Sequence, residues 1–369
     1  MIFYLRSSVV SEDIRLKKYV DACKKENIEY CVIGWDREGK SILSENEIHF
    51  KMLAPYGRLW KNAFAKLVWQ FFLFFKLFYH RRKISTIHAC DFDTMLPALL
   101  LCFFSNKKVI YDVYDAFSVK NPSTFFQRFI RYIDVFFIKK CDVLILADAK
   151  RSEQMGIDIK EQEKLFVVEN VPNEEITQNS YNHSETIDYS EKIRLSYVGV
   201  LELNRGIENL LQFVLENELV SLDIAGVGSL NLAVSAAAEK TNRIRYHGFI
   251  PYKEGLKIMK DSHFIIGMYH PVTENQKYAA PNKFYESLFL GRPLVTSYNT
   301  LVGEKVEKFD TGFLVHDDYV TFKVELSNII KSSNIEVKCL NAIKLWQNTY
   351  KTYFDKRLCG DYIELIKNN

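Results

Sequence analysis

Short apolar runs alternate with helix-like patterns along most of this chain, and this alternation limits the folds open to it. The first series of runs comprises Ile2–Leu5, Tyr30–Ile33, Ile84–His88, Val109–Asp112, Val143–Leu146 and Leu165–Glu169. A second series comprises Leu195–Val198, Ser221–Ala225, Arg243–His247, Phe264–Met268 and Leu294–Ser297. Strands separated by helices form parallel sheets that helices cover on both faces. The predicted class is therefore α/β, with two Rossmann-like, doubly wound domains.

The length of 369 residues also favours two domains of ordinary size. A polar, irregular stretch from Glu174 to Lys192 is typical of a linker or an exposed loop. We predict an N-terminal domain over 1–173, a C-terminal domain over 174–342 and a final helix over 343–369. The seven cysteines are widely spaced without a C-x-x-C pair, which favours a reducing cytoplasm over disulfides or zinc. The first residues are typical of a strand and not of a signal peptide.

The segment Pro281–Pro293 has the composition of an anion-binding helix. Pro281 suits a first helical turn, so Lys283 would lie where backbone N–H groups and the helix dipole attract phosphate. Glu286 follows one turn later on the same side and could accept the two hydroxyls of a ribose. Gly291 is typical of a helix end. The alternative is an ordinary capped helix of an α/β protein.

This segment resembles the donor-binding helix of GT-B glycosyltransferases, notably the retaining family four, with its Pro-x-Lys-x-x-Glu and Gly-x-Pro-Val pattern. Three further segments resemble that family in the same order, namely Tyr197–Leu211, Asp223–Gly228 and Tyr246–Ile250. The resemblance implies a nucleotide-sugar site formed by Gly199, Arg205, Gly226, Phe249, Ile250, Lys283 and Glu286, with Glu274 as a possible additional carboxylate.

The resemblance also implies an activity. A hexose-type sugar would pass from a UDP-sugar, or next a GDP-sugar, to a lipid-linked or surface-polysaccharide acceptor with retention. The two domains would face each other across a cleft, with the final helix crossing back to the N-terminal domain. No metal cofactor is expected, because Lys283 and Arg205 supply positive charge.

Three positions depart from the family pattern. Tyr278 stands eight residues before Glu286, where the family often has another glutamate, Val200 replaces a frequent arginine, and Tyr114 replaces a frequent histidine. A non-catalytic partner subunit, a sugar-nucleotide 2-epimerase and an inverting transferase therefore stay open. A dinucleotide oxidoreductase is disfavoured, because no G-x-G-x-x-G follows the first strand.

Catalytic residues are expected at strand ends of the N-terminal domain. We rank Asp115 first as the group that orients or deprotonates the acceptor, followed by Asp91 and His88. Asp91-Phe-Asp93 has the spacing of a metal-binding Asp-x-Asp motif but lies in the domain that would not bind the donor.

The stretch from Ile48 to Cys90 contains no Asp or Glu and is rich in aromatic and basic residues. On a helical wheel the aromatic residues occupy one half and basic or polar residues the other. A second such stretch covers Phe125–Lys140. Lys66, Gln70 and Lys76 interrupt the first stretch, so a helix lying on an anionic leaflet fits better than a membrane span.

The alternative is that the aromatic half packs on the sheet. The membrane interpretation predicts an acceptor face that includes Trp60, Lys66, Phe71, Phe75, Arg128 and Arg131. It places the protein in the cytoplasm, peripheral on the inner face of the plasma membrane. Nucleic acid is a poor partner, because the net charge is only +3 and no recognised binding module is present.

Overall fold

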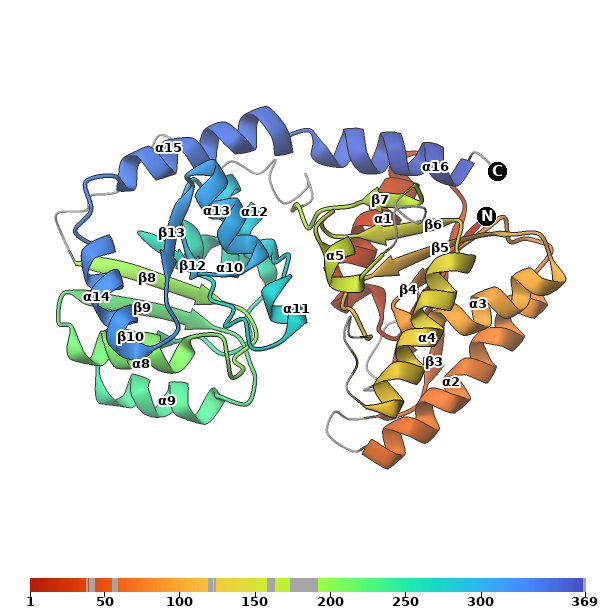
Figure 1. Cartoon of the computed structure of the whole chain (residues 1–369), viewed down its shortest axis with the longest axis horizontal. Coiled ribbons are helices and arrows are strands. Elements are labelled where there is room, and N and C mark those ends of the chain that lie inside the picture. Colours follow the sequence, from red (N-terminus) through yellow and green to blue (C-terminus); the bar gives the residue numbers. More distant parts are fainter. Residues whose placement is uncertain are drawn as a thin grey trace. The chain divides into compact units, whose positions relative to one another are not determined.

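The computed structural model describes residues 1–37, 39, 44–54, 59–118, 122, 124–157, 163–172 and 192–367, except for the side chains of residues 12 and 59–63. The chain divides into two compact units (Figure 1). Unit 1 comprises Met1–Glu169 and Tyr353–Asn369, and unit 2 comprises Asn170–Thr352.

Unit 1 contains a seven-stranded parallel sheet in the order β3-β2-β1-β4-β5-β6-β7. The strands are β1 (Ile2–Arg6), β2 (Tyr30–Asp36), β3 (Glu47–Lys51), β4 (Thr86–Cys90), β5 (Lys108–Val113), β6 (Val143–Leu146) and β7 (Leu165–Val167). The first strand lies inside the sheet and the order reverses there, as in doubly wound folds. In the register, Tyr4 of β1 lies between Val32 of β2 and His88 of β4.

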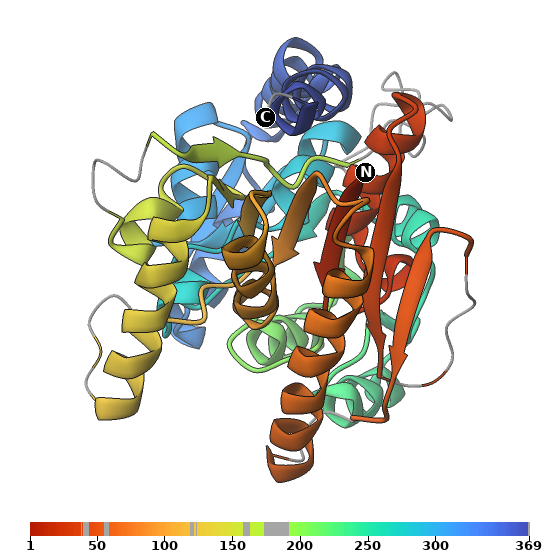
Figure 2. The same ribbon diagram turned by 90° about the vertical axis from the view of Figure 1, so that its right-hand side faces the viewer.

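Helices cover both faces of this sheet. One face carries α1 (Ile14–Lys25), η3 (Phe354–Tyr362) and α16 (Ile363–Lys367), and its core includes Tyr4, Tyr19 and Tyr362. The other face carries α2 (Leu59–His80), α3 (Phe92–Phe104) and α4 (Phe125–Lys140), which Figure 2 shows in front of the strands. Shorter helices are η1 (Val10–Glu12) and α5 (Arg151–Met155).

Unit 2 repeats the design with a six-stranded parallel sheet in the order β10-β9-β8-β11-β12-β13. Its strands are β8 (Ile193–Val198), β9 (Val220–Ala225), β10 (Ile244–Tyr246), β11 (Phe264–Ile266), β12 (Leu294–Ser297) and β13 (Gly312–Val315). Its helices are α8 (Ile207–Glu216), α9 (Asn231–Lys240), α10 (Tyr252–Lys260), α11 (Glu274–Lys277), α12 (Asn282–Leu290), α13 (Leu301–Phe309), α14 (Tyr319–Ile329), α15 (Ile335–Leu345) and η2 (Trp346–Tyr350).

The predicted fold class is confirmed, and every predicted strand is present with small differences at its ends. The edge strands β3 and β13 were not predicted from the sequence. Only Phe50 of β3 is buried, so this strand lacks a continuous apolar run. In β13, a Cβ on Gly312 would lie 2.0 Å from the carbonyl oxygen of Leu294. This close approach requires glycine, and glycine weakens the strand signal.

Candidate functional site

Two glycine turns in unit 2 bring backbone atoms unusually close together. Gly199 follows β8 and Gly226 follows the neighbouring strand β9, and their φ angles are +154° and +136°. A Cβ on Gly226 would lie 1.7 Å from the carbonyl oxygen of Gly199, and one on Gly199 would lie 2.7 Å from Lys283 Nζ. Gly226 therefore allows the Gly199 carbonyl to approach closely, and Gly199 leaves room for the Lys283 ammonium group over the β8 turn.

The ammonium group of Lys283 is buried at the start of α12. This helix begins after Pro281 and ends at Gly291, whose φ is +62°, as the local sequence signals predict. Lys283 is 8% exposed, its Nζ lies 4.8 Å from the ring centroid of Tyr197, and within the described part of the chain it forms no ion pair. Burial lowers the pKa of Lys283 to about 8, although the nearby Glu286 raises it. A buried cation that no described carboxylate contacts within ion-pair distance suits an anionic ligand.

Arg205 adds a second cation near the same turn. It precedes Gly206 at the start of α8, and its guanidinium carbon lies 4.5 Å from the ring centroid of Tyr269. Its charge is one cause of the lowered pKa of Lys283, so the two cations repel each other in the ligand-free protein. A ligand with two or more negative charges would relieve this repulsion.

A tyrosine that the sequence analysis missed orients the carboxylate of Glu286. Glu286 is 5% exposed, and the hydroxyl of Tyr252 donates a hydrogen bond of 2.9 Å to its Oε1 atom. Tyr252 is the first residue of α10 and directly follows Ile250 and Pro251. Its position beside the predicted base-binding segment was the available signal, but its partner lies 34 residues away in sequence.

The remaining predicted donor residues are less closely connected. Phe249 is 81% exposed and Ile250 is partly buried. Glu274 is exposed in the first turn of α11, where Thr273 caps the helix. Among the described residues, no hydrogen bond or ion pair joins Glu274 to Lys283 or Glu286. The structure thus groups Gly199, Gly226, Arg205, Lys283 and Glu286, and leaves the other three at the periphery.

In unit 1, the carboxylate of Asp91 connects the carboxyl ends of the neighbouring strands β4 and β5. It follows β4 with a φ of +68°, forms an ion pair with Arg6, and its Oδ1 accepts hydrogen bonds from the backbone N–H groups of Tyr114 and Asp115 at 2.9 and 3.3 Å. Burial raises the pKa of Asp91 to about 6, while Arg6 acts in the opposite direction. Asp91 therefore holds the loop that carries Asp115.

Asp115 is exposed just beyond β5 and is accessible to a ligand of unit 1. The buried Arg151 lies nearby, donating 2.6 Å to the carbonyl oxygen of Tyr114, and the Asp115 charge raises the pKa of this guanidinium while burial lowers it. Of the three catalytic candidates, Asp115 is the most exposed.

His88 lies inside the core instead. Its side chain is fully buried, with Nδ1 2.8 Å from the hydroxyl of Tyr362 and Nε2 3.3 Å from Oδ2 of Asp112. Burial lowers the pKa of His88. This position argues against His88 as a group that touches an acceptor. His88, Cys90 and Asp112 could converge on a metal ion, but the Arg15 guanidinium already pairs with Asp112 at 2.9 Å and would repel a cation.

Apart from Trp69 and the partly buried Phe72, the aromatic residues of α2 whose side chains are described lie mostly outside its sheet-facing side. The sheet-facing stripe is Ala65, Trp69, Leu73 and Leu77, all fully buried. The alternative that the aromatic half packs on the sheet is wrong for most of that half, because its members Phe64, Leu67, Phe71, Phe75 and Phe78 are exposed. The other exposed large apolar side chains of α2, α3 and α4 are Tyr79, Leu96, Leu100, Phe103, Phe104, Phe125, Phe126, Phe129, Tyr132 and Phe136.

The other residues of the predicted acceptor face differ in exposure. Lys66 and Arg128 are exposed, whereas Arg131 is partly buried and donates to Ser118 Oγ and to the carbonyl oxygen of Gly156. The side chain of Trp60 lies outside the described residues. Within the part of the chain that the structure describes, no helix has both the length and the apolar character needed to cross a bilayer.

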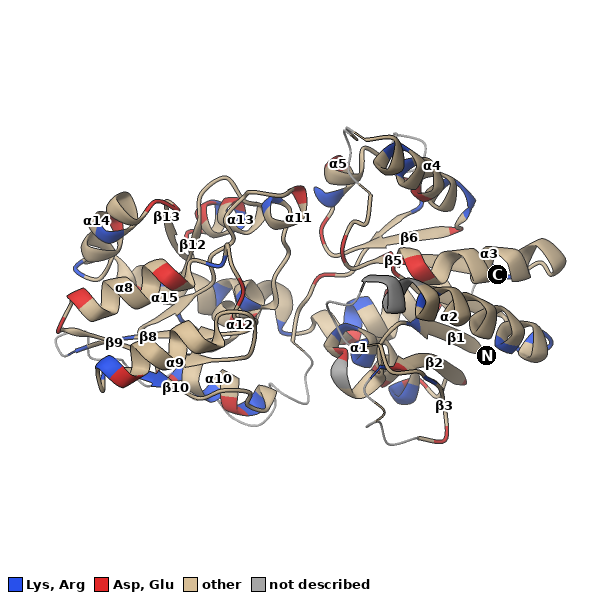
Figure 3. Cartoon of the chain, turned by 90° about the horizontal axis from the view of Figure 1, so that it is seen from below, with Lys and Arg blue, Asp and Glu red and all other residues tan. Residues whose placement is uncertain are grey.

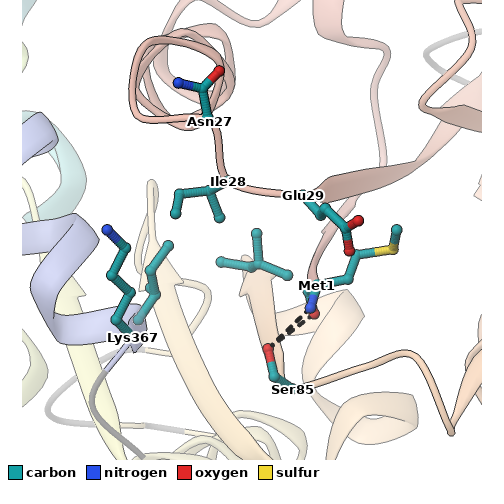
Figure 4. A pocket seen from close by; sticks show the side chains of 8 residues that line it. Met1, Asn27, Ile28, Glu29, Ser85 and Lys367 are labelled. Carbon is teal, nitrogen blue, oxygen red and sulfur yellow. Dashed lines mark hydrogen bonds between the residues drawn. The ribbon is translucent and has the colours of Figure 1, made fainter.

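A pocket of about 260 Å³ in unit 1 lies away from these candidates. Its lining includes Met1, Ile28, Glu29, Ser85 and Lys367 (Figure 4). Met1 and Ser85 precede β1 and β4, whereas Asp91 and Asp115 follow the carboxyl ends of β4 and β5. In a parallel sheet these are opposite edges, and ligands of such sheets bind at the carboxyl edge.

Comparisons with known proteins show the type of fold. No protein-family profile matches the chain, and no curated protein matches it in sequence. Solved structures do match. HepE of Anabaena in complex with UDP is 13% identical over 100% of both chains, with a TM-score of 0.68. The sucrose-phosphate synthase of Thermosynechococcus elongatus is 12% identical over 100% of both chains, with a TM-score of 0.75.

A putative UDP-N-acetylglucosamine 2-epimerase of Listeria monocytogenes is also similar, with 14% identity, a TM-score of 0.64, and coverage of 100% of this chain and 97% of that chain. At these identities the likeness is one of fold. The predicted resemblance to GT-B proteins is therefore confirmed at the level of the fold, with two Rossmann-like domains.

Proposed function

We propose that this protein is a glycosyltransferase that binds a nucleotide sugar in unit 2, with a UDP-sugar favoured and a GDP-sugar next. The observation that carries the proposal is the buried, unpaired ammonium group of Lys283 over the Gly199 turn. The helix start and Arg205 would bind the diphosphate with Lys283, and Glu286, oriented by Tyr252, would accept the ribose hydroxyls. HepE, a protein of the same fold, binds UDP, and this supports uridine as the base.

In the proposed reaction, the bond between C1 of a hexose and the diphosphate oxygen breaks, and a bond from C1 to an acceptor hydroxyl oxygen forms. The acceptor proton passes to the departing diphosphate, directly or by way of the Asp115 carboxylate, and the configuration at C1 is retained. Arg205 and Lys283 stabilise the charge that develops on the leaving group, which is usually the largest contribution of such a site. These two cations supply the charge that a metal ion would otherwise provide, so we propose a metal-independent reaction.

The acceptor is proposed to be a lipid-linked saccharide of a surface polysaccharide, used at the cytoplasmic face of the plasma membrane. The exposed aromatic and basic side chains of unit 1 support this choice, because such a mixture suits an interfacial substrate. Asp115 would orient or deprotonate the acceptor hydroxyl, with Asp91 holding its loop in place.

The test is a transfer assay with UDP- and GDP-sugars and polyprenyl diphosphate-linked saccharides, in EDTA and in Mg²⁺. The proposal requires transfer with one nucleotide series at similar rates in both buffers, and retained configuration of the product by NMR. A Glu286→Gln variant should lose affinity for UDP. The exposed Glu239→Gln on α9 is its matched control and should bind as the wild type does.

Two other functions give different results in the same assay. A sugar-nucleotide 2-epimerase, favoured by the Listeria structure, would convert the donor without any acceptor. A non-catalytic subunit, favoured by Tyr278, Val200 and Tyr114 at positions where relatives differ, would bind UDP without turnover. Transfer rates that require Mg²⁺ would contradict the metal-independent mechanism.

UDP binding should take up a proton at alkaline pH. Lys283 has a pKa of about 8 in the free protein, and a bound diphosphate should raise it. Above pH 8 the complex would hold more protons than the free protein, so affinity should fall as the pH rises. At pH 9 the phosphate is fully ionised, since its second pKa is about 6. Calorimetry at pH 9 in buffers of different ionisation enthalpy measures the uptake, and identical enthalpies in all buffers would contradict it.

Asp115→Asn should lower kcat by roughly 100- to 10,000-fold, the usual contribution of a positioned acid or base. The affinity for UDP should not change, because Asp115 belongs to unit 1 and the proposed donor site to unit 2. Steady-state kinetics and UDP calorimetry separate the two effects. Glu153→Gln, which removes another exposed carboxylate of unit 1, is the control. Unchanged kcat in Asp115→Asn would remove Asp115 as the candidate.

A further inference from the structure

Exposed aromatic side chains concentrate on three neighbouring helices of unit 1. Helix α2 packs against α3 and α3 against α4, and Figure 2 shows the three side by side. Among the described residues, every exposed Phe or Tyr other than Phe117 and Phe249 lies on one of them. Tyr79 on α2, Phe103 on α3 and Phe125 on α4 are 77%, 85% and 86% exposed. We call this surface of α2, α3 and α4 the aromatic face.

The fold of unit 1 does not explain these rings. Trp69 of α2 already packs on Trp35 and Phe50 of the sheet, with ring centroids 5.7 and 5.6 Å apart. The core of the unit is thus filled from the opposite stripe of the helix. An exposed apolar surface of this size in a folded protein indicates a partner.

The charges of the aromatic face indicate the chemistry of that partner. Helix α2 contains no Asp or Glu, and Asp134, the one carboxylate of α4, is fully buried and accepts a 2.9 Å hydrogen bond from Tyr111. Asp93 lies in the first turn of α3. Exposed cations on α4 include Arg128, Lys139 and Lys140. Figure 3 shows α2 and α3 as mostly uncharged, with blue segments on α2 and α4.

Aromatic rings can insert at the headgroup level of a bilayer, and lysines and arginines beside them attract anionic lipid headgroups. The cores of protein interfaces, by contrast, are depleted in lysine. We infer that the aromatic face docks unit 1 on an anionic lipid bilayer, with rings from all three helices inserted at the headgroup level and cations against the phosphates. This inference rests on the proposed function for its biological reason, a lipid-linked acceptor, but its chemistry is independent of the nucleotide site.

Sedimentation with vesicles tests the inference on the full chain. Wild-type protein should bind phosphatidylglycerol vesicles, bind phosphatidylcholine vesicles more weakly, and dissociate as salt is raised. The double variants Phe103→Ser/Phe104→Ser and Phe125→Ser/Phe126→Ser should each bind roughly 10- to 100-fold more weakly, because two inserted rings are lost. Leu232→Ser is the control, since Leu232 is 85% exposed on α9 of unit 2.

A second pair of variants tests the cations. Lys139→Glu/Lys140→Glu in the last turn of α4 should weaken binding to anionic vesicles by about 30-fold or more, from about 1 kcal/mol for each basic residue near the surface. Lys240→Glu, in the last turn of α9, should have no effect. Binding to neutral vesicles should change little in either variant.

Three outcomes would overturn the inference. The first is wild-type protein that does not bind anionic vesicles, and the second is ring variants that bind them as tightly as the wild type does. The third is a wild-type dimer, detected by light scattering, that does not bind vesicles and that the ring substitutions convert to monomer. Failure of the proposed function is distinguishable. Lys283→Ala should keep full vesicle binding, and the ring variants should keep the wild-type affinity for UDP.

Discussion

Replacing Lys283 with methionine should stabilise the ligand-free protein and abolish its affinity for UDP. The ammonium group is 8% exposed, and burial lowers its pKa from 10.5 to about 8. Each unit of pKa shift corresponds to about 1.4 kcal/mol, so the charged form costs the fold roughly 3 kcal/mol at neutral pH. Methionine has an unbranched side chain of similar length without the charge. We expect a gain of about 1 to 3 kcal/mol in the free energy of unfolding.

The loss of UDP binding has the same physical origin. A buried cation that forms no ion pair with the described residues is unfavourable until the diphosphate arrives, and its removal should weaken UDP binding by about 100-fold or more. UDP stabilises the wild type by mass action and should not stabilise the variant. Thermal unfolding with and without UDP, together with calorimetric titration, measures both effects.

Lys240→Met is the matched control, because it removes an exposed lysine from α9 of the same unit. It should change neither the stability nor the affinity. A Lys283→Met protein that is less stable than the wild type would show that the ammonium group supports the fold. An unchanged UDP affinity would remove Lys283 from the proposed site.

Local signals made part of this site predictable. Pro281 and Gly291 mark the two ends of α12 in the sequence, and Lys283 and Glu286 share a face because helical geometry fixes their spacing. The glycine turns are also local features. Tyr252 and Tyr269 were not predictable in the same way, because their contacts with Glu286 and Arg205 join separate elements.

The sequence could not decide which stripe of α2 is buried. A helical wheel separates aromatic from basic residues, but the buried stripe depends on which side chains the sheet presents. Trp35 and Phe50, on β2 and β3, pack with Trp69, and β3 itself was not predicted. The burial of the His88 side chain could not be predicted for a similar reason. It lies inside β4, and the alternation of the strand directs its side chain toward Tyr362, far away in sequence.

Asp112→Asn should destabilise unit 1 by about 3 to 5 kcal/mol, because it would leave the charge of Arg15 buried without its partner. Asp112 is fully buried, and its carboxylate accepts from Arg15 Nη2 at 2.9 Å and from the Tyr19 hydroxyl at 2.8 Å. Although burial alone would raise the pKa of Asp112, Arg15 and His88 together hold it well below its usual range. Tryptophan fluorescence during urea unfolding follows unit 1, since Trp35, Trp60 and Trp69 belong to it and only Trp346 to unit 2.

The pH dependence separates this ion pair from ordinary packing. Because the pKa of Asp112 is lowered on folding, its contribution is fully present above the unfolded pKa of about 4 and is lost as the pH falls below that value. The difference between wild type and Asp112→Asn should therefore be constant from about pH 5 to 8 and shrink in acid. Asp223→Asn, which weakens the surface pairs of Asp223 with Arg245 and His247, should cost less than about 1 kcal/mol. Two results would show that the buried carboxylate is not the charge partner on which Arg15 depends. One is equal stability of Asp112→Asn and Asp223→Asn. The other is a stability difference between wild type and Asp112→Asn that is as large at pH 3 as at pH 7.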